Sequence, residues 1–402
     1  MRSVVILLFA LIPLQSAEPD ALAISANIQA KHLPYGTILD PIYAAKDSDQ
    51  IVNYTRCGDS AIWTGHYLAA ESYRYAVTKS PEALTAVRNA IQGINMLLNV
   101  TGNNLLARCF VPAGSQYAGP ISQEEKHNGI YTATYNGDQY LWVGNTSRDQ
   151  YAGVFYGLTV AHDVVDDNGV QGSVRYLVAR MLDYLRGHGW FVIMPDGSVS
   201  TTFIGSGQHQ LSFLKIGRRM DGHYTTAYKA LSISLAPETI APIALDVKDP
   251  YDSYFKFNLD TISFYGLLAS GDSSWVRLNY EKAYDILRNT VDDHQNAFFN
   301  MIDRAINGPN ATRDEQTRQL LDAWLQRPRR DDWVDLRSDV PTCDDATRAC
   351  DPIPVERRVR TDFLWQRSPF QLYGGGDDLI ETAGIDYILP YWMGRYYGVI
   401  TD

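Results

Sequence analysis

Apolar residues recur at helical spacing along most of the chain, in segments that come in pairs. In the segment 59–79, the apolar residues Ile62, Ala69 and Tyr73 recur at helical spacing. This spacing places them on one face of a helix, which would be its buried face. Pro81 follows this segment and suits the first position of a second helix, PEALTAVRNAI. We therefore predict a helical hairpin at this point of the chain.

The same arrangement recurs four more times: an apolar helix, a turn rich in Gly, Asp, Asn or Pro, and a more charged helix. The turns fall at 167–169, 221–222, 271–272 and 308–310, and one last helix is expected near 386–397. Hairpins that cannot bury their own apolar face must stack on neighbours.

The long segments between these helices help to choose between a closed ring and an open solenoid. They cover 99–147, 190–208 and 327–385, and unequal loops of this length suit a ring that carries function on one rim. We predict an all-α fold, an (α/α)6-type toroid with apolar helices inside and charged helices outside.

Two of these loops also predict short strands. Residues 111–147 alternate Tyr and Thr and favour a β-hairpin or a rim loop, and residues 190–206 indicate two strands around a Pro-Asp-Gly turn. The Arg-, Asp- and Pro-rich segment 327–361 is interpreted as a surface excursion.

The composition excludes some classes of protein. With 45% hydrophobic and 20% charged residues, the chain is globular rather than disordered. A net charge of -11 and the lack of a basic stripe argue against nucleic-acid binding. The aromatic content of 12% suits a protein that stacks sugar rings, although ordinary helix packing also uses such residues.

The first 17 residues have the pattern of a secretory signal peptide. Arg2 precedes an apolar run, and Ala17 offers a small residue for cleavage. The run is too short to span a bilayer comfortably, and a retained N-terminal anchor is the alternative. We predict a signal peptide over 1–17, one toroid domain over 18–402, a secreted or periplasmic protein, and no membrane span in the mature chain.

The chain has four cysteines, which suits an oxidising compartment. Their order suggests the disulfides Cys57–Cys109 and Cys343–Cys350, although the sequence leaves the pairing open. No CxxC, Cys/His cluster or HExxH is present, so we predict no metal site and no cofactor.

Four stretches carry a resemblance to a known family: DSAIWTGHYLAAESYRYAVTKSPEAL, NTSRDQYAGVFYGL, GWFVIMPDGSVST and DFLWQRSPF with ETAGIDYILPYWMGRYYG. Together they resemble secreted proteins of the six-hairpin glycosidase superfamily over roughly residues 55–400. The resemblance implies an (α/α)6 toroid whose central funnel binds sugar, with carboxylates at inner-helix N-termini in acid/base roles. It also covers polysaccharide lyases and non-catalytic relatives. One position departs from the pattern. Related sequences often read Asp-Thr-Ser before the Asp of the third inner helix, and here Asn145 takes the place of the first Asp.

Asp59 and Asp149 are the candidate catalytic carboxylates. Glycoside hydrolysis needs one carboxyl to protonate the leaving oxygen and a second to activate water or attack carbon. Each of these two begins a predicted inner helix, so a toroid can bring them to one funnel mouth. The simpler alternatives are an Asp that complements the helix dipole at 59, and a cap by Thr146 or Ser147 with Asp149 in the first turn.

Further residues are candidates for substrate binding, with packing, capping or turn roles as the alternatives. Trp63 and Tyr67 follow Asp59 by one and two helical turns, and Arg148 suits a uronate carboxylate. The candidates are Trp63, Tyr67, Arg148, Gln150, Asp196, His294, Trp365 and Arg367.

Three functions compete. The first is a glycoside hydrolase acting on an oligo- or polysaccharide through Asp149 and Asp59. The second is a polysaccharide lyase that uses Tyr151 or His294 as the base and Arg148 to neutralise a uronate. The third is a non-catalytic glycan-binding toroid, which Asn145 favours. The oligomeric state is open.

Overall fold

The computed structural model describes residues 17–248, 254–270, 275–340 and 351–401. The helices within these ranges are α1 Glu18–Asn27, α2 Ser60–Thr78, α3 Pro81–Asn99, α4 Ala118–Glu124, α5 Arg148–Val164, α6 Asn168–Gly187, α7 Gly207–Met220, α8 Thr225–Leu235, α9 Ile240–Asp246, α10 Phe255–Leu268, α11 Trp275–Val291, α12 Ala297–Asn307, α13 Ala311–Trp324 and α14 Ile385–Tyr396. The strands are β1 Asp40–Tyr43, β2 Ile51–Thr55, β3 Cys109–Pro112, β4 Ile130–Tyr135, β5 Asp138–Val143, β6 Phe191–Ile193, β7 Val199–Thr202, β8 Val334–Asp335 and β9 Tyr373–Gly374.

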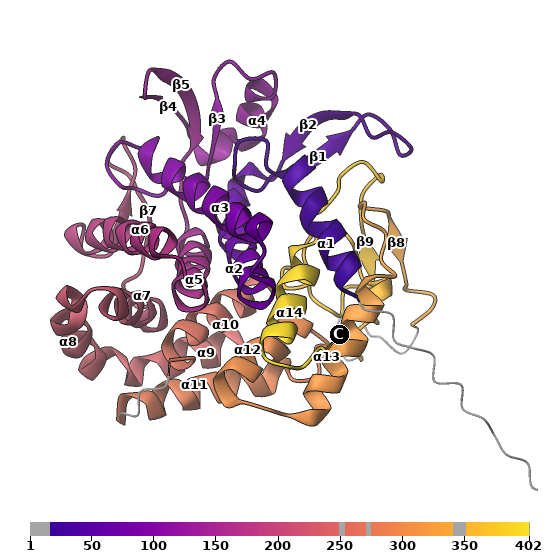
Figure 1. Cartoon of the computed structure of the whole chain (residues 1–402). Helices are drawn as coiled ribbons and strands as arrows, with labels where there is room; N and C mark the ends of the chain where they lie inside the picture. The colour runs from indigo at the N-terminus through magenta and orange to yellow at the C-terminus, as the bar shows by residue number, and fades with distance from the viewer. Residues whose placement is uncertain (1–16, 249–253, 271–274, 341–350, 402) are drawn as a thin grey trace, which may run out of the picture.

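The helices form a closed ring of hairpins. The inner helices α2, α5, α7, α10 and α12 contact one another in chain order, and α14 closes the ring against α12 and α2. The outer helices α3, α6, α8, α11 and α13 each pack against the inner helix that precedes them (Figure 1). The predicted all-α toroid of hairpins is confirmed.

The sixth hairpin is assembled from the two ends of the chain. Helix α14 is the last of the described helices, and α1 packs on it as the outer partner (Figure 1). Arg395 of α14 also donates a hydrogen bond of 2.5 Å to Glu18 of α1. The sequence predicted the last helix but not its partner.

Glycines bring α2 and α5 into backbone contact. A Cβ atom on Gly65 would lie 2.1 Å from the carbonyl oxygen of Gly153, and one on Gly157 would lie 2.2 Å from that of Gly65. Real side chains do not tolerate such distances, so both helices depend on glycine here. This contact fixes the starts of α2 and α5 side by side.

Aromatic rings fill the middle of the ring. Trp365 is fully buried, with its ring centroid 4.9 Å from that of Phe298 and 6.2 Å from that of Trp63. Toward the other end of the ring, the hydroxyls of Tyr73 and Tyr265 lie 2.9 Å apart. The centre of the ring is therefore a packed core of aromatic side chains.

Small sheets and one disulfide organise the rim. Strands β3, β5 and β4 form an antiparallel sheet, and β6 pairs with β7 around the predicted Pro-Asp-Gly turn. The Cys57–Cys109 disulfide is confirmed. The Cys343–Cys350 pairing, most of the signal peptide and the turn at 271–272 lie outside the described residues. Among the described helices, none combines the length and the apolar character needed to cross a membrane.

Candidate active site

Asp59 and Gln150 join the starts of α2 and α5. The side-chain amide nitrogen of Gln150 donates to Asp59 Oδ1 at 3.0 Å. The amide oxygen of Gln150 accepts the backbone N–H of Ile62, also at 3.0 Å. Because both ends of this buried amide are occupied, its orientation is fixed and its N–H group points at the Asp59 carboxylate.

Arg108 connects the two candidate carboxylates. Its guanidinium lies 3.6 Å from Asp59 Oδ1 and donates to the Ser147 hydroxyl at 2.7 Å. The Ser147 hydroxyl in turn donates to Asp149 Oδ1. The Cys57–Cys109 disulfide links the segment that contains Asp59 to the segment that contains Arg108. Asp59 and Asp149 thus belong to one hydrogen-bonded network.

The environment of Asp59 favours its protonated form. Partial removal from water and the nearby negative charge of Asp149 raise the pKa of Asp59 to about 6, against the lowering effects of Arg108 and Gln150. A smaller contribution in the raising direction comes from Asp362. A carboxyl group with this pKa holds its proton in mildly acidic solution, as a general acid must.

Neither helix start uses its polar side chains as a cap. Asp59 stands at the N-cap of α2 and Ser147 at that of α5, yet neither side chain accepts a hydrogen bond from its own helix. The Thr146 hydroxyl donates instead to the carbonyl oxygen of Leu106 at 2.6 Å. The side-chain caps considered for Thr146 and Ser147 are therefore not formed, while Asp59 at the N-cap of α2 and Asp149 in the first turn of α5 do lie where a carboxylate complements the helix dipole.

A cavity of about 500 Å³ opens beside Asp149. It spans the starts of α5, α7 and α10, together with β7 and the end of α9. Its size falls within the range of small-molecule sites in proteins. The lining residues are Arg108, Ser147, Arg148, Asp149, Thr201, Gln208, His209, Asp246, Phe255, Lys256, Leu259 and Asp260.

Several predicted substrate-binding residues lie at or near this rim. Arg148 lines the cavity and donates to the Ser206 hydroxyl. Trp63 packs edge-on against Phe363, with ring centroids 4.9 Å apart. Arg367 forms an ion pair with Asp362, the residue whose charge reaches Asp59. Trp365 lies beneath these rings in the core rather than on an open surface.

Three other candidates lie elsewhere or are occupied. Tyr67 is fully buried and lines a separate cavity with Gln29 and Tyr35, because a residue eight positions after Asp59 has turned by about 80° around the helix. His294 is packed against Phe370, and its Nδ1 lies 3.1 Å from the Tyr254 hydroxyl. Asp196 is exposed and accepts hydrogen bonds from Ser198 within its own turn.

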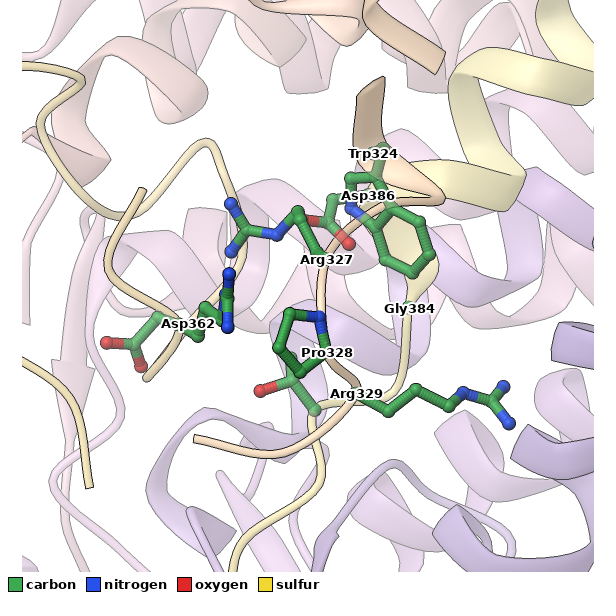
Figure 2. Close-up of a pocket in the computed structure, with 9 residues that line it drawn as sticks. Trp324, Arg327, Pro328, Arg329, Asp362, Gly384 and Asp386 are labelled. Carbon is green, nitrogen blue, oxygen red and sulfur yellow. The ribbon is translucent and has the colours of Figure 1, made fainter. Parts of the chain in front are cut away.

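A second cavity lies in the loops that precede α14. Figure 2 shows Trp324, Arg327 and Asp386 around it, with Asp362 at its far side. Burial lowers the pKa of Arg327 to about 10. The cavity itself has a volume of about 30 Å³, enough for a water-sized group. It is therefore too small for a sugar.

Some residues of the rim have little or no recognisable pattern in the sequence. Arg108 gave no signal, because a lone arginine beside a cysteine has no recognisable pattern. Asp260 did leave a trace, since it is a single charge inside the apolar helix FNLDTISF. No group of three His, Cys, Asp or Glu side chains suited to a metal ion occurs in the parts of the chain that the structure describes.

Comparison with solved structures gives a likeness at low sequence identity. No protein-family model matches the chain, and no curated protein matches it. Among solved structures, the chain is similar to cellobiose 2-epimerase from Spirochaeta thermophila, with 11% identity and a TM-score of 0.46 over 95% of this chain and 97% of that chain. The chemistry of this chain is therefore argued from its own residues.

Proposed function

We propose that the chain is a glycoside hydrolase in which Asp59 acts as the general acid and Asp149 as the second carboxylate. Asp59 would protonate the leaving glycosidic oxygen, and Asp149 would activate water or attack the anomeric carbon. The observation that carries this proposal is the network that joins Asp59 to Asp149 through Arg108 and Ser147; within it, burial and the charge of Asp149 raise the pKa of Asp59 to about 6. Two neighbouring carboxyl groups in different environments are the usual arrangement for separate acid and base roles.

The surroundings of the pair support this division. Asp149 accepts a hydrogen bond from the Ser147 hydroxyl, which itself accepts one from Arg108. A chain of donors that ends on a carboxylate suits a residue that acts in its ionised form. Gln150 and Arg108 are positioning residues, since both hold Asp59 at the rim.

The lyase alternative has less support. Tyr151, a candidate base, is fully buried, and its hydroxyl accepts the backbone N–H of Leu106 at 3.2 Å. The other candidate, His294, is enclosed by aromatic rings, and burial lowers its pKa to about 4.

The departure at Asn145 bears on the non-catalytic alternative. Asn145 has a positive φ of 49°, a conformation that Asn adopts more readily than most residues. Its side-chain amide donates to Asn128 at 3.3 Å, and its carbonyl accepts from Arg108 at 2.8 Å. These contacts give Asn145 a role in shaping the turn before α5, which supports a structural explanation of the departure at this position.

The proposed substrate is an oligo- or polysaccharide, and the proposed location is outside the cytoplasm. The Cys57–Cys109 disulfide supports an oxidising compartment. The cavity beside Asp149, with Phe255 in its wall, supports a carbohydrate ligand.

A panel of glycans tests the proposal. The protein is incubated with neutral and uronate-containing polysaccharides at pH 5, and the products are assayed for new reducing ends and for the absorbance of unsaturated uronides. New reducing ends without unsaturated uronides support a hydrolase. Unsaturated products would establish the lyase, and binding without turnover on any glycan would establish the non-catalytic alternative.

A further inference from the structure

Three buried polar side chains line the cavity next to Asp149. Gln208 and His209 come from the first turn of α7, and Asp260 comes from α10. Their exposed fractions are 3%, 4% and 2%. None of them takes part in the Asp59–Arg108–Asp149 network, so that network leaves their purpose unexplained.

These side chains leave polar atoms unpaired. Within the described chain, Asp260 Oδ2, Gln208 Oε1 and both ring nitrogens of His209 have no hydrogen-bond partner. Gln208 and Asp260 are joined by one long contact, 3.4 Å from Gln208 Nε2 to Asp260 Oδ1. A buried polar atom without a partner costs roughly 1–3 kcal/mol, and such a cluster at a cavity wall indicates a place where a ligand completes the bonding.

The cluster is electrically neutral. Burial and the charge of Asp246 raise the pKa of Asp260 well above its ordinary value, so this carboxyl keeps its proton. Burial and the charge of Arg148 lower the pKa of His209 to about 3, so the imidazole is uncharged. The protonated carboxyl donates a hydrogen bond, the Gln208 oxygen accepts one, and a neutral imidazole does both.

We propose that Gln208, His209 and Asp260 form a subsite that binds the hydroxyl groups of a neutral sugar ring beside Asp149. Each sugar hydroxyl both donates and accepts, which matches the mixed donors and acceptors of the cluster. A carboxylate only accepts, so a uronate whose carboxylate faced this cluster would leave Gln208 Oε1 unpaired. Leu259 and Phe255 add an apolar wall for the C–H face of the ring. The subsite rests on the proposed function for its role in hydrolysis, but its binding can be measured separately.

The alternative ligand is an acidic sugar. Arg148 and Lys256 also line the cavity, and neither forms an ion pair with another described side chain. A uronate bound by these two cations would depend on them and not on the neutral cluster. The two ligand classes therefore predict opposite sensitivities to substitution.

Calorimetric titration separates them. Asp149→Asn serves as the background so that no sugar is consumed, and the probes are tetrasaccharides of glucose, xylose and mannose together with tetragalacturonate. Asp260→Leu and Gln208→Met are each expected to weaken binding of the best neutral probe at least ~10-fold, the loss expected for one or two buried hydrogen bonds. Thr159→Val removes another buried inner-helix hydroxyl, one bonded to the Phe155 carbonyl, and is expected to leave the affinity unchanged.

Thermal unfolding guards against a trivial loss of structure. Replacing an unpaired buried carboxyl by Leu should leave the melting temperature unchanged or raise it, whereas a purely structural Asp260 would make it fall. Asp260→Asn keeps the shape of the side chain and provides a second reading if the Leu variant does not fold.

The outcomes distinguish the subsite from the hydrolase. Neutral binding that is insensitive to Asp260 and Gln208, preferential binding of tetragalacturonate, or no binding of any neutral probe overturns the subsite. Neutral binding that depends on the cluster, without hydrolysis of any glycan by the wild-type protein, upholds the subsite and overturns the hydrolase.

Discussion

The outer and inner helices of the ring begin differently. The outer helices α3, α6 and α13 start on Ser80, Asp167 and Asn310, whose side chains each accept a hydrogen bond from the backbone of their own helix. The inner helices α2, α5 and α7 start on Asp59, Ser147 and Ser206, which do not. These inner side chains are engaged with Gln150, Asp149 and Arg148 instead.

The difference separates positions selected for stability from positions that suit function. A side-chain cap is worth about 1 kcal/mol to a helix, and the outer helices α3, α6 and α13 have it, whereas the outer helix α8 does not. At the cavity rim the corresponding groups are directed toward a carboxylate pair and its neighbours, at the expense of that stabilisation. Helix α12 is the exception among inner helices, since Asn296 caps it, and the residues at its start do not line the cavity beside Asp149.

The largest expected effect is the loss of catalysis when Asp149, at the start of the inner helix α5, is replaced. Asp149→Asn keeps the size of the side chain and removes its charge, so we expect kcat on a substrate found with the glycan panel to fall roughly a thousandfold. The folded state should persist, as judged by circular dichroism. A variant with full activity would show that Asp149 is not part of the chemistry.

The next effect concerns the contact that aligns the inner starts. Gly157→Ala places a Cβ atom against the backbone of Gly65, and we expect a loss of about 3 kcal/mol in unfolding free energy, measured with urea. The matched control is Gly172→Ala in the outer helix α6, where a Cβ atom meets nothing within 4 Å. That change should stabilise by about 0.5–1 kcal/mol. Equal effects at both sites would contradict the close α2–α5 contact.

The pH dependence of hydrolysis tests the network around Asp59. Because Asp59 must be protonated to act as the acid, kcat/KM should fall as the pH rises through about 6. Arg108 lowers the pKa of Asp59, so Arg108→Gln should move this alkaline limb to higher pH. If the alkaline limb of kcat/KM stays at the same pH in Arg108→Gln, or moves to lower pH, a group other than Asp59 controls it.

The smallest effects compare one outer and one inner start directly. Asp167→Ala removes the cap of α6 and should cost about 1 kcal/mol of stability without changing activity. Asp59→Asn should instead increase stability and reduce activity. The folded-state pKa of Asp59 lies above its unfolded value, so its ionisation destabilises the fold as the pH rises from about 4 through 6.

We therefore expect Asp59→Asn to stabilise the protein by about 1 kcal/mol at pH 8, a value kept small by the partial exposure of the side chain, and not at pH 4. Thermal unfolding at the two pH values measures this. A loss of stability at pH 8 would show that Asp59 has a structural role like that of Asp167.

Much of the ring could be predicted from the sequence because its signals are local. The 308–310 turn and the Pro81 start mark hairpins whose two helices adjoin in the chain, and the apolar runs show which helix is inside. The pairing of α1 with α14 joins the two ends of the chain. No local pattern specifies such a contact.

The candidate site was harder to predict, for the same reason. Asp59 and Asp149 stand at helix starts and carry a recognisable signal, whereas Arg108 joins them from a rim loop. Tyr67 was expected on the Asp59 face because an eight-residue spacing was treated as one face, yet the helix has rotated by then. Gln208 has no sequence pattern, and its proximity to Asp260 depends on the packing of α7 against α10.

The central claim is that Asp59 and Asp149 form one coupled pair in which Asp59 keeps its proton. Carboxyl-carbon NMR titration of the wild-type protein, with Asp59 assigned through Asp59→Asn, measures this without any substrate. The account predicts a midpoint for Asp59 of about 6 and a lower midpoint in Asp149→Asn, where the neighbouring charge is absent. An Asp59 carboxyl that titrates near the ordinary value of about 4 in both proteins would contradict it.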